Sequence, residues 1–215
     1  NPKITQTNYL YDTYNNILKI SEQGDTAVTG DERFSYVDYT YNTALWIMDK
    51  PRHTYLFGAD DASKLSEQWF YYDGHGATDD SPAKGDLTKQ VAWLSGGTNP
   101  EMKYEYDSFG NKTKETDAKN NATTIVYETT GTYPISSTNA KNQTTEITYD
   151  PGTGNVLSKK DPNNNTTTYT YDVFGRISKE VQPYDTTTFP TTSYQYFFDG
   201  TAPEGIKVSK REISG

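Results

Sequence analysis

The sequence lacks the residues from which several kinds of functional site are built. It has no cysteine and only two histidines, so disulfide bonds and thiol chemistry are excluded, and a nucleophilic triad has little to be built from. Hydrophobic residues make up only 32% of the chain. No apolar run approaches the roughly 18 residues that a membrane-spanning helix needs, so we expect no membrane insertion.

Positive charge is also in short supply. Lys and Arg number 20 against 29 Asp and Glu, which gives a formal net charge of -9 and a pI near 4.7. The chain has no basic block that could follow a phosphate backbone. We therefore expect no nucleic-acid partner.

Aromatic residues compensate for the scarce aliphatic ones. The chain has 19 Tyr and 8 Phe, and each ring buries a large area while a Tyr hydroxyl can stay in water. This combination suits a thin β-sheet with a solvated face.

A repeat of about 22 residues organises the second half of the chain. The segment Tyr104–Asn111 (YEYDSFGN) returns at Tyr169–Ile177 (YTYDVFGRI), with an intermediate copy at Ile147–Val156. The acidic residues of this series are Asp107, Glu128, Asp150 and Asp172. A second series with the same period lies between them, at residues 117–120 (DAKN), 139–142 (NAKN) and 161–164 (DPNN).

Both series predict turns. An Asp side chain accepts a hydrogen bond from the backbone two residues on, and Gly or Asn at the fourth position adopts the positive φ that closes a hairpin. Between turns, Tyr169 and Tyr171 share one face and Thr168 and Thr170 the other, which predicts strands of roughly 6 to 8 residues. The predicted structural turn residues are Asp12, Asn15, Asp107, Gly110, Asp150, Gly154, Asp172, Gly175, Asn120, Asn142 and Asn164.

The repeats divide the chain into three segments and predict an all-β fold, an extended antiparallel sheet of repeated β-hairpins forming a curved strip. Residues 1–100 hold irregular YD-like repeats with an expanded loop near 74–82, residues 101–200 hold regular repeats, and residues 201–215 begin an incomplete one. Tyr9–Ile17 is a good early copy. Phe197–Gly200 is predicted to open the last one.

The Y-x-Y-D-x-x-G-R/N pattern, stated most clearly by Tyr169–Ile177, resembles the YD or Rhs repeat of bacterial polymorphic toxins, of the B and C components of insecticidal Tc toxins, and of the teneurins. In that family the repeats form a strip that spirals into a hollow shell around a toxic domain or another polypeptide. The resemblance implies a wall section of a secreted or cell-surface bacterial protein, in contact with the remainder of the parent toxin polypeptide and its enclosed cargo. Asp161-Pro162 is similar to part of the family's self-cleaving element, but it occupies an ordinary repeat turn.

We interpret the two histidines and the paired carboxylates as structural residues and not as binding or catalytic sites. His53 and His75 lack a neighbouring ligand set with metal spacing, so we interpret them as loop or surface histidines. The carboxylate pairs Asp60-Asp61 and Asp79-Asp80 are interpreted as solvated loop charge, with calcium binding and glycoside hydrolysis as the alternatives.

The sequence thus predicts a non-enzymatic scaffold without a cofactor, a section of an Rhs/YD-repeat shell that encapsulates a toxin or other polypeptide. The alternative is a cell-surface adhesion or carbohydrate-binding module, in which Trp46, Trp69, Trp93 and the 74–82 loop meet a glycan. The start at Asn1, without a methionine or a leader, predicts a fragment or mature product of something longer. Because terminal strands leave backbone groups unpaired, we also predict self-association through sheet edges.

Overall fold

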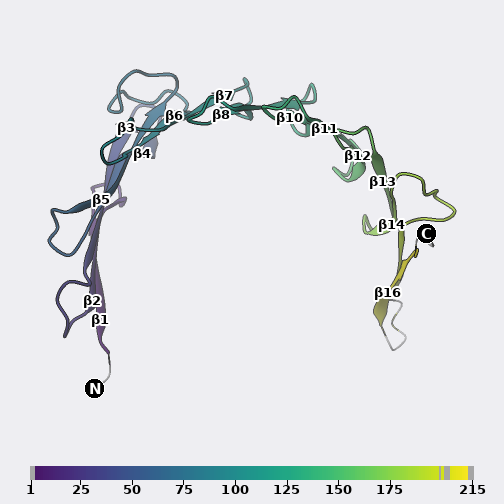
Figure 1. The fold of residues 1–215 in the computed structure, drawn as a ribbon, viewed down its shortest axis with the longest axis horizontal. Coiled ribbons are helices and arrows are strands. Elements are labelled where there is room, and N and C mark those ends of the chain that lie inside the picture. Colours follow the sequence, from purple (N-terminus) through teal and green to yellow (C-terminus); the bar gives the residue numbers. More distant parts are fainter. Residues whose placement is uncertain (1–2, 199, 201–203, 213–215) are drawn as a thin grey trace. The chain divides into compact units, whose positions relative to one another are not determined.

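The fold is all-β (Figure 1). The computed structural model describes residues 3–198, 200 and 204–212, and every regular element in these ranges is a strand. Among the described residues, strands β1 to β8 pair in the order of the chain, as do strands β9 to β16, and the strand pairs are antiparallel. The predicted fold class, an antiparallel sheet of repeated hairpins, is confirmed. In the part of the chain that the structure describes, no helix has the length and hydropathy to cross a membrane.

The chain is organised as two compact units, and the first comprises residues 1–121. Its strands are the longer ones, up to 11 residues in β4. Five of its seven hairpin pairings contain a register shift, at which one strand carries an extra residue. The strands are β1 (Thr5–Tyr11), β2 (Ile17–Asp25), β3 (Arg33–Asn42), β4 (Ile47–Phe57), β5 (Lys64–Tyr72), β6 (Leu87–Ala92), β7 (Glu101–Tyr106) and β8 (Lys112–Thr116).

The second unit comprises residues 122–215 and is more regular. Its strands have five or six residues, shorter than the expected 6 to 8, because the turns take up much of each half-repeat. They are β9 (Ala122–Tyr127), β10 (Pro134–Thr138), β11 (Thr144–Tyr149), β12 (Val156–Lys160), β13 (Thr166–Tyr171), β14 (Ile177–Val181), β15 (Thr192–Phe197) and β16 (Gly205–Lys210). The predicted last copy, Phe197–Gly200, includes Asp199, which lies outside the described residues, as do parts of the predicted segment 201–215.

Few side chains are buried in either unit. Among the described residues these are Thr40, Tyr72, Pro82, Val91, Val181 and Thr192. Most strand residues are half-buried, as expected of a single sheet without a second layer. The stability of such a sheet depends on strand pairing and on contacts between neighbouring side chains of one face.

The expanded loop after β5 is folded back onto the first unit. The Asp73 carboxylate accepts hydrogen bonds from the backbone N–H groups of residues 83–86. Thr40 donates from its hydroxyl to the Asp80 carbonyl at 2.9 Å, and the Asn42 amide donates to the Pro82 carbonyl at 2.8 Å. Since Pro82 is less than 2% exposed, the end of the 74–82 loop is packed against β3.

Candidate functional site

The repeat turns share one hydrogen-bonding pattern. In the turn that begins at Asp172, the carboxylate oxygen Oδ1 accepts hydrogen bonds from the backbone N–H groups of Phe174 at 2.9 Å and Arg176 at 3.0 Å. The same contacts to the second and fourth following residues are made by Asp12, Asp107, Asp117, Asn139 and Asp161. The two predicted turn series therefore have the same local structure.

The fourth residue of each such turn, counted from the Asp or Asn that opens it, has a positive φ. Gly110 and Gly175 have φ values of 85° and 76°, and Asn at the same position has 70° at Asn15, 62° at Asn120, 58° at Asn142 and 66° at Asn164. Gly and Asn tolerate this left-handed conformation better than other residues do. The turn from Asp150 is one residue longer: Gly154, with φ of 73°, donates its N–H to the Asp150 carbonyl.

The turn carboxylates stay ionised at low pH. The side-chain hydrogen bond from Thr130, followed by backbone N–H groups of the same turn, lowers the pKa of Glu128 from 4.5 to about 2. Desolvation acts to raise the pKa of Asp12, but hydrogen bonds from Tyr41 and Asn16 outweigh it, so that this pKa falls from 3.8 to about 2. Hydrogen bonds to the charged form thus favour ionisation.

Tyrosine hydroxyl groups connect consecutive hairpins. Tyr171, the last residue of β13, donates a hydrogen bond to the carbonyl of Val156, the first residue of β12, at 2.7 Å. We call this contact the tyrosine clasp. It recurs from Tyr39 to Ile17, from Tyr72 to Pro51, from Tyr106 to Leu87 and from Tyr196 to Ile177, with distances of 2.7–3.3 Å. The carbonyl partners of these tyrosines could not be predicted from the sequence, because each partner depends on strand register.

The interpretation of His53 as a loop or surface histidine is wrong. His53 lies within β4, its side chain is 22% exposed, and its ring stacks on Trp69 with 5.4 Å between the ring centroids. Its Nε2 lies 2.7 Å from Glu67 and its Nδ1 lies 3.5 Å from Asp38. The ring therefore joins side chains of three neighbouring strands. His75 lies in the 74–82 loop, as expected.

The acidic pairs of the loops have local partners. Asp60 accepts hydrogen bonds from the backbone of Ala62 and Ser63, and Asp61 forms an ion pair with Lys19 at 2.8 Å. Asp80 accepts a hydrogen bond from the Ala77 backbone. The described residues include no group of three or more His, Asp or Glu arranged to hold a metal ion.

The three tryptophans differ in exposure. Trp46 is 80% exposed at the turn between β3 and β4, with a positive φ of 58°. Trp69 stacks on His53, and the Lys64 ammonium lies 4.5 Å from the centroid of the Trp93 ring. One face of the Trp69 and Trp93 rings is thus covered by another side chain of the sheet.

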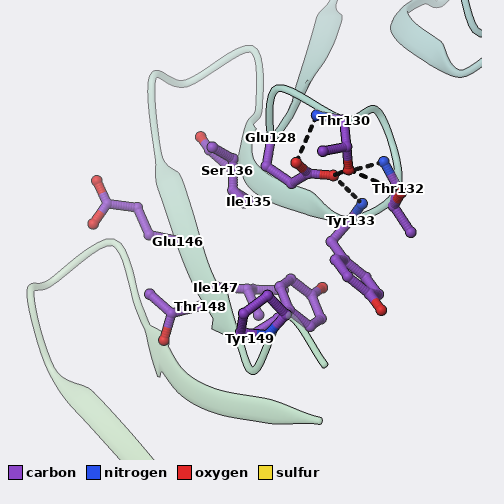
Figure 2. Close-up of a pocket in the computed structure, with 11 residues that line it drawn as sticks. Glu128, Thr130, Thr132, Tyr133, Ile135, Ser136, Glu146, Ile147, Thr148 and Tyr149 are labelled. Atoms are coloured by element: carbon purple, nitrogen blue, oxygen red, sulfur yellow. Dashed lines mark hydrogen bonds between the residues drawn. The ribbon is translucent and has the colours of Figure 1, made fainter. Parts of the chain in front are cut away.

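The second unit carries a concave site that the sequence did not indicate (Figure 2). We call it the Tyr133 pocket; Glu128, Tyr133, Ile135, Glu146, Ile147 and Tyr149 are among its lining residues, and its volume is about 690 Å³. The rings of Tyr133 and Tyr149 stack, with 4.9 Å between centroids and 18° between planes. Two features of the sequence could have indicated this site: Glu128 replaces the Asp of the other turns, and the turn that it opens has six residues. Tyr133 is the last of these residues and immediately precedes β10.

The repeat turns share one hydrogen-bonding pattern, tyrosine clasps connect consecutive hairpins, and the strand order follows the chain. Together these features define a structural repeat scaffold. Residues 149–187 match the model of the RHS repeat family, so this segment of the chain is similar to an RHS repeat. The matched segment contains Tyr169–Ile177, the clearest copy of the motif. No curated protein sequence matches the chain.

Solved structures of toxin complexes are among the similar folds. The chain is 14% identical to a chain in a crystal structure of TcdB2-TccC3-Cdc42, with a TM-score of 0.34 over 89% of this chain and 12% of the other. It is 14% identical, with a TM-score of 0.33 and the same coverage, to a chain of the Photorhabdus luminescens Tc holotoxin pore with a mutated TccC3. The chain spans about 12% of those solved chains.

Proposed function

We propose that this chain is a section of a repeat wall that encloses a polypeptide cargo within a secreted bacterial protein. The observation that carries the proposal is the strand order, in which each hairpin is followed along the sheet by the next hairpin of the chain. A sheet of this kind extends by one hairpin for each added repeat, so its area grows linearly with chain length.

The role of such a wall is containment. Strand hydrogen bonds give it continuity, and each of the five tyrosine clasps ties a hairpin to the one before it. The turns lie at the ends of the strands, so turns of different length do not interrupt pairing. This role needs neither a cofactor nor a nucleophile, and we propose that the chain is not an enzyme. Its partners are then the rest of the parent polypeptide and the enclosed cargo.

Protease protection tests the containment. We expect that, in the natural protein that carries this segment, a non-repeat polypeptide resists a broad-specificity protease while the repeats are folded and is digested once urea unfolds them. The same non-repeat polypeptide, produced by itself, is the control and is digested at once. Equal digestion rates in the intact protein and the isolated polypeptide would contradict the proposal.

The adhesion or carbohydrate-binding alternative has less support. It requires open aromatic faces and a projecting loop, whereas Trp69 and Trp93 are each covered on one face and Pro82 is packed against β3. Binding of the full chain to a glycan array, abolished by Trp46→Ala at the exposed turn, would restore it.

A further inference from the structure

The connection between β14 and β15, residues 182–191, is longer than the repeat turns, and we call it the Tyr184 loop. It presents two aromatic rings to solvent, because Tyr184 is 99% exposed and Phe189 is 65% exposed. Tyr184 also has a positive φ of 76°, which is unusual for a bulky residue and persists only where the surrounding structure fixes the backbone. Exposed apolar groups that lie together in this way are typical of interaction sites.

Hydrogen bonds close the base of this loop. The backbone N–H of Gln182, at its start, donates to the hydroxyl of Thr191, at its end, at 2.8 Å. The Thr191 hydroxyl in turn donates to the Asp185 carboxylate at 2.5 Å, and the Arg211 guanidinium donates to the same carboxylate at 2.6 Å. A loop that is already ordered loses little conformational entropy when its exposed rings bind a partner.

The Tyr133 pocket is an apolar hollow on one face of the second unit. Ser136 of β10 pairs with Glu146 of β11, and because side chains alternate along a strand, both point to the opposite face. The pocket face carries Ile135, Ile147 and the stacked rings of Tyr133 and Tyr149 (Figure 2). The floor therefore offers apolar surface to an occupant.

The loop and the pocket do not meet within one copy of the chain. Strands β12 and β13 lie between β11, which belongs to the pocket, and β14, which precedes the loop. The pocket volume of about 690 Å³ lies within the usual size of binding pockets, roughly 300–1,000 Å³. The loop has exposed rings without a cover, and the pocket has an apolar floor without an occupant, so a second copy supplies what each lacks.

We propose that two copies of this chain form a dimer in which the Tyr184 loop of each copy enters the Tyr133 pocket of the other. An aromatic side chain buries about 150–250 Å², so two rings and the surface that they cover amount to roughly 600–1,000 Å² for one contact. A stable interface buries about 1,200–2,000 Å², which two such contacts provide. The contacts are then related by a two-fold axis, the commonest symmetry of protein dimers.

Sedimentation velocity of the full 215-residue chain tests the dimer, in a Leu10→Lys background that suppresses pairing through β1. We expect Phe189→Ser to weaken dimerisation about tenfold, because each dimer loses two buried rings. Val173→Ser, which removes another exposed apolar side chain at the turn after β13, is the control and leaves dimerisation unchanged. A Leu10→Lys chain that stays monomeric at high concentration, or equal dimerisation of the Phe189→Ser and Val173→Ser variants, would overturn the proposal.

Cysteine cross-linking locates the surface that the loop contacts. The chain has no cysteine, so a mixture of a Phe189→Cys variant and an Ile147→Cys variant forms disulfides only between the introduced thiols. With copper(II) phenanthroline as oxidant, we expect a cross-linked heterodimer, because the second contact of the dimer remains intact and holds the two thiols together. Leu157→Cys, on β12 and outside the pocket lining, replaces Ile147→Cys in the matched control. Equal yields of heterodimer in the two mixtures would show that the loop does not enter the pocket.

Discussion

The hydroxyl group of Tyr171 lies 2.7 Å from the carbonyl oxygen of Val156, on the strand before its own. Tyr171 stands immediately before Asp172, which opens a turn. Its hydroxyl is thus bonded to the backbone that follows an earlier turn, the one that begins at Asp150. Through this contact the repeat motif acts between hairpins as well as within one.

Removing this hydroxyl tests the clasp. We expect Tyr171→Phe to lower the free energy of unfolding by about 1 kcal/mol, since it deletes a half-buried hydrogen bond and keeps the ring. Urea unfolding followed by circular dichroism measures the change. Tyr184→Phe is the control, because Tyr184 is 99% exposed, and it is expected to have no effect. A loss of the same size in both variants would show that the clasp does not stabilise the sheet.

The left-handed position of the turns can be tested at Asn164, whose φ is 66°. We expect Asn164→Ala to destabilise the chain by about 1 kcal/mol, because a Cβ without a local hydrogen bond disfavours this conformation, while Asn164→Gly retains stability. Thermal unfolding of the two variants measures the difference. Asn163→Ala, one residue earlier in the same turn, should be neutral; a neutral Asn164→Ala would contradict the argument.

Acid should destabilise the chain through the turn carboxylates. The pKa values of Glu128 and Asp12 in the folded chain, about 2, lie below their ordinary values of 4.5 and 3.8. The stability that these groups contribute is therefore fully present above about pH 4.5 and is lost as the pH falls toward 2. Circular dichroism between pH 7 and 2 measures the loss. Glu128→Gln should make the dependence shallower below pH 4.5, and an unchanged slope would exclude this cause.

The 74–82 loop should be held to β3 by Thr40, which is 4% exposed and donates to the Asp80 carbonyl. We expect Thr40→Val to cost about 1–2 kcal/mol of local stability, because the side chain keeps its shape but loses its hydroxyl. Limited proteolysis within the loop should become faster. Thr43→Val, at the exposed neighbouring turn, is the control; equal cleavage rates in the two variants would show that Thr40 does not hold the loop.

Strand β1 should mediate self-association, because all seven of its residues are exposed and β2 is its only neighbour among the described strands. We expect concentration-dependent oligomers in sedimentation velocity, and a shift toward monomer in Leu10→Lys, since a charge on an edge strand opposes pairing with another chain. Leu65→Lys on the interior strand β5 is the matched control. A strictly monomeric chain at high concentration would contradict the prediction.

How far the sequence predicts the structure depends on the range of each interaction. The turns were predictable because the contacts from Asp172 to Phe174 and Arg176 lie within five residues. The clasp from Tyr171 to Val156 and the stacking of His53 on Trp69 depend on strand register and were not predicted. The same holds for the 74–82 loop, whose contacts with β3 join residues about 40 positions apart. The Tyr133 pocket was missed because it arises from a departure from the repeat.

The shared turn chemistry constrains how a chain of this kind changes length. Asp150, Asp161 and Asp172 stand eleven residues apart, and successive ones open turns at opposite ends of the strands. A duplication of 11 residues would preserve every local turn and yet reverse the direction of all strands downstream, so that every later turn would lie at the opposite edge of the sheet. A duplication of about 22 residues adds a whole hairpin and leaves the downstream strands in their original direction. Tandem duplication in the gene is therefore compatible with the sheet only in steps of two strands.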